Sequence, residues 1–88
     1  MIRGLETLSL DKNSFTSVQN GTFKNFPMLI TLSLRHNQID VLQDDAFIGL
    51  NSLQKLDLSY NGIVAVSGGS LKHLNRLLLL DFTHNFLR

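Results

Sequence analysis

One pattern of leucines and asparagine occurs four times in this chain, at a constant spacing of 24 residues. The pattern reads L-x-x-L-x-L-x-x-N, with a further apolar residue two positions after the asparagine. Its copies are LETLSLDKNSF at residues 5–15, LITLSLRHNQI at 29–39, LQKLDLSYNGI at 53–63 and LLLLDFTHNFL at 77–87. Self-similarity at a fixed period of this length is typical of solenoids, in which each unit stacks on the next. We therefore predict a stack of similar coils.

Alternating leucines in each copy predict a short β-strand. Side chains two positions apart on a strand share a face, so Leu8 and Leu10 are expected to point inward and Thr7 and Ser9 outward. A strand this short cannot bury one face by itself. Stacking equivalent strands side by side does bury it, and creates a parallel sheet along one side of the solenoid.

An asparagine follows each predicted strand, where the chain must turn out of the sheet. Its side chain can both donate and accept hydrogen bonds, and backbone that leaves a strand inside a packed coil has to be paired. We predict a structural ladder of asparagines that bridges neighbouring coils. Its members are Asn13, Asn37, Asn61 and Asn85.

The remaining half of each unit returns the chain to the next strand. Its apolar spacing suits a short helical or 3₁₀ turn. Phe23 and Phe47 fall one period apart, which predicts a packed aromatic column rather than a ligand site.

These columns resemble the leucine-rich repeat family, from residue 5 to residue 87. The period, the phenylalanine column and asparagine at every ladder position are similar to the family's typical 24-residue class. That class is common in extracellular animal proteins such as Toll-like receptors, Slit-like proteins and variable lymphocyte receptors. The resemblance implies a curved right-handed solenoid with a concave parallel β-sheet and an irregular or 3₁₀ convex side. It also implies an extracellular or cell-surface location within a longer receptor or adhesion protein, and a role in immunity.

We predict one domain over residues 1–88. It would comprise repeats at 5–28, 29–52 and 53–76, a partial repeat at 77–88 and, at 1–4, the tail of a preceding repeat. The family's extracellular members usually carry cysteine-rich caps, whereas this chain contains no cysteine. Because terminal repeats normally need polar caps for solubility, uncapped ends favour a homo-oligomer, and a self-assembling structural module is the alternative function.

Composition argues against several classes of function. The formal net charge is +1 and charged residues make up 17% of the chain, which predicts no nucleic-acid partner and no polybasic membrane surface. The longest apolar run, at residues 77–80, is far shorter than the roughly 20 residues that span a bilayer. We find no phosphate-binding glycine motif and no nucleophile with a base beside it, and expect no enzyme activity, no cofactor and no metal site.

Outward positions of the strands and of the turns after them form the predicted recognition surface. Equivalent positions on parallel strands lie about 4.8 Å apart, so they make continuous columns. The mixture of charged and aromatic side chains suits a protein ligand or co-receptor, because Tyr and Arg often dominate binding energy. An ordinary solvated surface is the alternative for any single residue. The candidates are Asp11, Lys12, Arg35, His36, Lys55, Asp57, Tyr60, Leu79, Asp81 and His84.

Two local features add to this surface. Asn20-Gly21-Thr22 fits the N-glycosylation pattern N-x-[ST] and falls on the return half, where a glycan would face solvent. Leu78 and Leu79 occupy positions that are polar in the first and third copies. Exposed apolar residues often mark an interface, with a partner or with a second copy of the chain.

Overall fold

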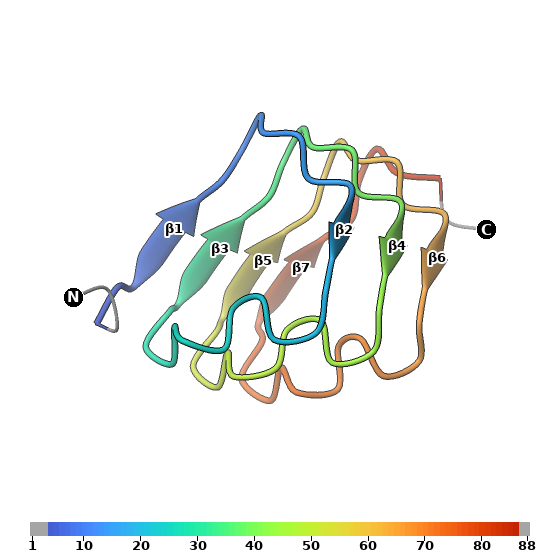
Figure 1. The fold of residues 1–88 in the computed structure, drawn as a ribbon. Coiled ribbons are helices and arrows are strands. Elements are labelled where there is room, and N and C mark those ends of the chain that lie inside the picture. The colour runs from blue at the N-terminus through green and yellow to red at the C-terminus, as the bar shows by residue number, and fades with distance from the viewer. Residues whose placement is uncertain (1–3, 87–88) are drawn as a thin grey trace.

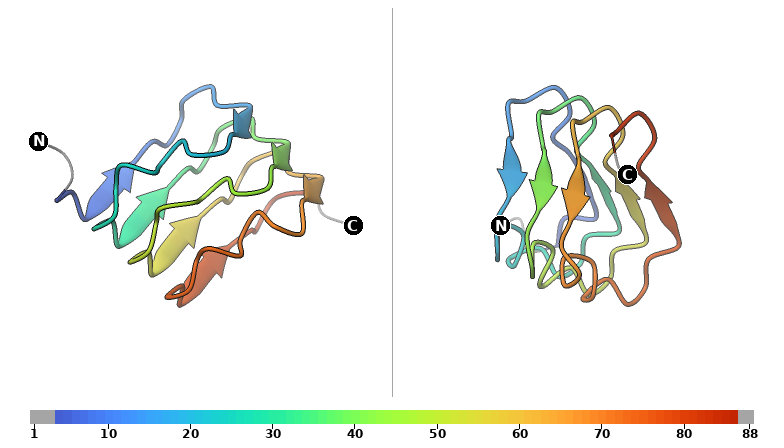
Figure 2. Two further views of the ribbon diagram at one scale, coloured as in Figure 1. Left: turned by 60° about the horizontal axis from the view of Figure 1, so that its bottom comes forward. Right: turned by 90° about the vertical axis from the view of Figure 1, so that its right-hand side faces the viewer.

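The computed structural model describes residues 4–86, which form a β-solenoid of stacked coils without a helix (Figure 1). One sheet contains the parallel strands β1 (Thr7–Ser9), β3 (Thr31–Ser33), β5 (Lys55–Asp57) and β7 (Leu79–Asp81). A second parallel sheet contains β2 (Ser17–Val18), β4 (Val41–Leu42) and β6 (Ala65–Val66). Figure 2 shows that the two sheets lie on different sides of the coils. The predicted leucine-rich repeat solenoid is confirmed.

The ends of the chain limit what can be compared with the predicted repeats. Of the predicted preceding tail at residues 1–4, only Gly4 is described, and Leu87 and Arg88 of the fourth copy also lie outside the described residues. Within residues 4–86 the structure contains no helix of the length and apolar character needed to cross a membrane.

Pairing in the four-stranded sheet advances by one sequence period at each step. Thr7 pairs with Thr31, Thr31 with Lys55, and Lys55 with Leu79. Backbone hydrogen bonds continue the register beyond the strand ends, for example from the amide of Leu34 to the carbonyl of Asp57 at 2.8 Å. Residues at equivalent positions of the repeats therefore stand in columns across the sheet.

The core lies between the two sheets. Leu32 and Leu56 project inward from the strands and are fully buried, and so are the leucines two positions further on. Phe23 and Phe47 stack in the return half, with ring centroids 6.3 Å apart and an angle of 10° between ring planes. The predicted inward leucines and aromatic column are confirmed. Full burial of such a side chain contributes about 1.5–3 kcal/mol, so coil stacking is the main source of stability.

The sequence pattern does not predict the second sheet. Each of its strands has two residues, too few for an alternating pattern to be recognised. Its strands pair because the stacked coils bring equivalent segments into register, Val18 beside Leu42 and Leu42 beside Val66. The rest of the return half is irregular, and the short helical or 3₁₀ turn predicted from its apolar spacing does not occur within residues 4–86. Its turns are closed by backbone hydrogen bonds between residues three positions apart, for example from the amide of Lys24 to the carbonyl of Gly21 at 3.2 Å. These bonds do not continue into a 3₁₀ helix.

The asparagine ladder joins each coil to the one before it. The Nδ2 of Asn61 donates to the carbonyls of Leu58 (3.0 Å) and Ser59 (3.2 Å) in its own coil and of Leu34 (3.0 Å) in the preceding coil. Its Oδ1 accepts from the amide of Ile39 at 3.2 Å. Corresponding bonds are made by Asn37 and Asn85. The predicted ladder is confirmed for Asn37, Asn61 and Asn85, whereas Asn13 bonds only within its own coil.

Replacing Asn61 by alanine should destabilise the fold because buried backbone groups lose their partners. Each such group costs about 1–3 kcal/mol when left unpaired. Asn13 is the matched control, since it is exposed and its side chain bonds only to its own coil, at Leu10 and Asp11. Urea unfolding followed by circular dichroism should show a clearly larger loss for N61A than for N13A. Equal losses would contradict a stabilising role for the bonds between coils.

Candidate functional site

The outward surface of the four-stranded sheet, together with the turns that follow its strands, is called the sheet face. All ten residues of the predicted recognition surface belong to it. Six of them are exposed, namely Lys12, His36, Lys55, Tyr60, Leu79 and His84. The other four are half-buried, namely Asp11, Arg35, Asp57 and Asp81.

The three aspartates of the sheet face each use one carboxylate oxygen within the fold. The Oδ1 of Asp57 accepts from the amide (2.9 Å) and hydroxyl (2.6 Å) of Ser59. Asp81 accepts in the same way from the amide (2.9 Å) and hydroxyl (2.7 Å) of Thr83. Asp11 instead reaches the next coil, where its Oδ1 accepts from Ser33 and from the amide of Arg35. These bonds fix the direction of each carboxylate.

Hydrogen bonds also keep Asp81 ionised. The hydroxyl and then the amide of Thr83 lower the pKa of the Asp81 carboxyl from its ordinary value of 3.8, and the charges of Arg35 and His84 add smaller effects. Hydrogen bonds to the charged form of a carboxyl favour ionisation.

Arg35 contacts both strand β5 and the turn that follows it. Its Nε donates to the hydroxyl of Ser59 at 3.0 Å and lies 3.5 Å from Oδ2 of Asp57. Its guanidinium carbon lies 5.5 Å from the centroid of the Tyr60 ring, within cation–π distance. Ser59 is only 1% exposed, although its place in the repeat is equivalent to those of Asp11 and Arg35. Its hydroxyl bonds to Arg35 and Asp57 and is not part of the exposed surface.

Three rings form a continuous stack along the turns after β3, β5 and β7. The ring centroids of His36 and Tyr60 lie 4.4 Å apart at an interplanar angle of 18°. Those of Tyr60 and His84 lie 4.1 Å apart at 14°. Tyr60 thus separates the two imidazoles, and no group of three potential metal ligands occurs within residues 4–86.

A left-handed backbone conformation produces this ring stack. His36, Tyr60 and His84 have φ of 56°, 58° and 60°, and Lys12 in the first coil has 60°. This conformation costs a non-glycine residue roughly 1–2 kcal/mol, so the packing of the coils must impose it. The sequence reveals that these residues share a column, but not that the backbone turns their rings face to face.

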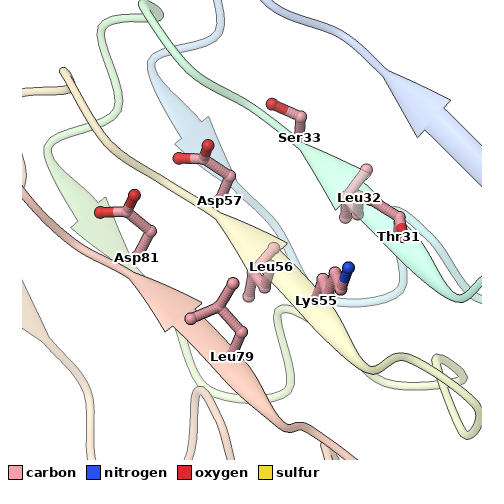
Figure 3. A pocket seen from close by; sticks show the side chains of 8 residues that line it. All are labelled: Thr31, Leu32, Ser33, Lys55, Leu56, Asp57, Leu79 and Asp81. Atoms are coloured by element: carbon pink, nitrogen blue, oxygen red, sulfur yellow. The ribbon is translucent and has the colours of Figure 1, made fainter.

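The sheet face also contains a hollow of about 170 Å³ (Figure 3). The short side chains of Thr31 and Ser33 border it on β3, and the longer Lys55 and Asp57 stand beside them on β5. Leu79 and Asp81 close it on β7, with Leu32 and Leu56 beneath. Leu79 is 56% exposed, so the predicted exposure of this apolar side chain is confirmed.

The return half carries a second polar cluster, which ties the second coil to the third. The Oδ1 of Asp45 lies 2.7 Å from Nε2 of His73 and 3.4 Å from Nζ of Lys72. Asp44 accepts from the hydroxyl of Ser67 and, at 2.9 Å, from the amide of Gly69.

A Cβ at position 69 would lie 2.7 Å from Oδ1 of Asp44, so any other residue there would displace the Asp44 side chain from its bonds to Ser67 and Gly69. Asn20 lies exposed on the same return half, in the turn that precedes Gly21 (φ 78°).

The geometry defines a class of protein, a parallel β-solenoid that displays residue columns on one sheet. Two family models match, both described as leucine-rich repeat, at residues 3–63 and 52–77. The first covers more than half of the chain, which therefore belongs to the leucine-rich repeat family. No curated protein matches the chain.

Among 48 matching chains of solved structures is one titled as the crystal structure of a TLR13–ssRNA13 complex. The match has a TM-score of 0.88 and 34% sequence identity, and it covers 91% of this chain. The chain spans 11% of the length of the chain that it matches.

This match overturns the expectation that nucleic acid is excluded as a partner. A protein with a segment of the same fold and 34% identity has been solved as a complex with ssRNA. The expectation rested on the net charge of 88 residues. In a solenoid each coil contacts only its neighbours, so the charge of a few coils does not determine what a long array binds.

Removing the central ring should abolish the ring stack. In Tyr60→Ala the ring protons of His36 and His84 lose the neighbouring aromatic face, and their NMR resonances should move toward the positions of free histidine. His73 is the control, because it lies in the return half against Asp45. Unchanged resonances of His36 and His84 would contradict the stack.

The return-half cluster should make the fold sensitive to acid. The Ser67 and Gly69 bonds lower the pKa of the Asp44 carboxyl below its ordinary 3.8, and the His73 bond lowers that of Asp45. A carboxyl with a depressed pKa in the folded state contributes stability above its unfolded pKa, and this contribution disappears as the pH falls through the folded value. The urea concentration at the midpoint of unfolding should therefore decrease when the pH is lowered below about 3.8.

Asp44→Asn and Asp45→Asn should weaken this acid dependence. Asp40→Asn is the control, because Asp40 is exposed and its side chain makes no hydrogen bond or ion pair within residues 4–86. Identical pH profiles for all three variants would show that the cluster does not couple folding to pH.

Proposed function

We propose that this chain is a non-enzymatic part of a receptor solenoid and that it recognises a protein partner on its sheet face. The leucine-rich repeat family generally mediates protein–protein recognition, and the chain belongs to that family. The observation that carries the proposal is the hollow in the sheet face, where exposed Leu79 stands among charged side chains. An apolar centre with a polar border is the usual anatomy of a protein interface.

Contacts among the site residues support this proposal because they order the surface before a partner arrives. Arg35 is held by Ser59, Asp57 and the Tyr60 ring. Immobilising a long side chain on binding costs about 0.5–1.5 kcal/mol, and a side chain that is already held avoids much of that cost. Arginine and tyrosine are also the residues that most often dominate binding energy.

The proposal places residues 1–88 in a longer extracellular or cell-surface protein. They would form one solenoid unit with repeats at 5–28, 29–52 and 53–76, part of a further repeat at 77–88, and the end of a preceding one at 1–4. The similarity to part of a much longer TLR13 chain supports this context. Asn20 is exposed on the return half, so a glycan there would leave the sheet face free for a ligand or co-receptor.

Single-stranded RNA is the second candidate partner, because the matched structure is a TLR13–ssRNA13 complex. Bases can stack on aromatic or guanidinium planes, and the sheet face offers both at Tyr60 and Arg35. Asp57 and Asp81 stand beside each other on the same face and would repel phosphates. We therefore favour the protein partner.

A display selection tests the proposed function. Peptides selected from a random library against the wild-type chain should bind Leu79→Asp at least about tenfold more weakly, because the charge would be buried in the interface. Val64→Asp is the matched control, since Val64 is 54% exposed and lies outside the four-stranded sheet. Circular dichroism should show both variants folded.

Peptides that bind both variants as well as the wild type would overturn the proposal. Light scattering of the same samples tests the alternative that the chain is a self-assembling module. In that case the wild-type mass would exceed that of one chain, and L79D would reduce it.

A further inference from the structure

The hollow of the sheet face extends over three neighbouring strands, β3, β5 and β7. β3 contributes Thr31 and Ser33, whose side chains are short, directly beside Lys55 and Asp57 of β5. These short side chains border a space of about 170 Å³ that extends across β5 to Leu79 and Asp81 of β7 (Figure 3). A space of this size accepts one long side chain rather than a helix or a globular surface.

One end of the hollow is apolar. Leu79 is 56% exposed and stands beside Lys55, whose aliphatic stem adds further apolar surface. A side chain that covers Leu79 would remove apolar surface from water, at about 25 cal/mol per Å². The occupant should thus have an aliphatic part.

The other end is acidic. Asp57 and Asp81 are paired positions on adjacent strands, about 4.8 Å apart. The Oδ1 of each carboxylate is engaged by Ser59 or Thr83, and Oδ2 of Asp57 lies 3.5 Å from Nε of Arg35. Within residues 4–86, Oδ2 of Asp81 is therefore the oxygen left to face a ligand. Arg35 neutralises Asp57, whereas Asp81 makes no ion pair within the part of the chain described, residues 4–86. The unbalanced negative charge is therefore at Asp81.

We infer that this hollow accepts an arginine side chain of a protein partner, an inference that rests on the proposed function. The methylenes of the arginine lie on Leu79, and its guanidinium donates to Oδ2 of Asp81, beside the Arg35–Asp57 pair. A guanidinium suits the Asp81 carboxylate because it presents five donors in one plane. Lys55 stands at the apolar end, where its charge directs the partner's cation toward Asp81.

NMR titration of the 88-residue chain with N-acetyl-arginine-N-methylamide tests the inference. The largest amide shifts should occur at Lys55, Asp57, Leu79 and Asp81. The corresponding citrulline amide, which has nearly the same shape without the charge, should bind more weakly. Asp81→Asn should weaken arginine binding about two- to fivefold, the range for one exposed ion pair. Asp40→Asn, which removes the same charge elsewhere, should leave binding unchanged.

Equal binding of the arginine and citrulline amides, or shifts confined to other residues, would overturn the inference. So would an unchanged affinity in D81N. The peptides selected by display distinguish this failure from failure of the proposed function. Selected peptides that bind L79D more weakly but are not enriched in arginine would support the sheet face as the binding site. They would overturn only the inference that the hollow accepts arginine. Shifts of the same four residues with a single-stranded oligouridylate in place of the arginine amide would instead assign the hollow to nucleic acid.

Discussion

The hydrogen bonds of the asparagine amides between coils are the interaction on which the rest of the structure depends. Each coil leaves its strand through a turn whose carbonyls would otherwise be buried without partners. Asn37, Asn61 and Asn85 satisfy those carbonyls in two coils at once. One residue thereby closes its own turn and fixes its distance and register to the preceding coil. Apolar burial supplies most of the free energy, but it does not by itself specify register.

Fixed register converts sequence columns into surface columns. Tyr60 stacks between His36 and His84 because all three occupy the same left-handed position one coil apart. Lys55 and Leu79 meet for the same reason. The sheet face is therefore rigid in its backbone and variable in its side chains. Such a surface can be adapted to new partners by substitution at outward positions without disturbing the core.

The two sides of the solenoid use their charges differently. On the return half, Asp44 and Asp45 are engaged by Ser67, Gly69, His73 and Lys72, and they serve the contact between coils. On the sheet face, each aspartate gives one oxygen to hydrogen bonds of the fold. The second oxygen of Asp57 pairs with Arg35, whereas Asp81 makes no ion pair within residues 4–86. Net charge cannot distinguish these roles, because it counts both kinds of carboxylate equally. The similarity to a protein solved with ssRNA shows how little the charge of a few coils excludes.

The sequence by itself determined the solenoid, the inward leucines, the asparagine ladder and the outward columns, because these depend on period and local chemistry. Those columns included the ten candidate residues, whereas Thr31 and Ser33, which border the hollow, were not among the candidates. Only the tertiary structure decided what the residues do there. The second sheet arises from contacts between coils, since strands of two residues have no pattern of their own. Burial of Ser59, the ring stack at Tyr60 and the hollow beside Leu79 likewise depend on backbone angles and neighbouring side-chain lengths. Those are properties of packed coils, which a single repeat does not encode.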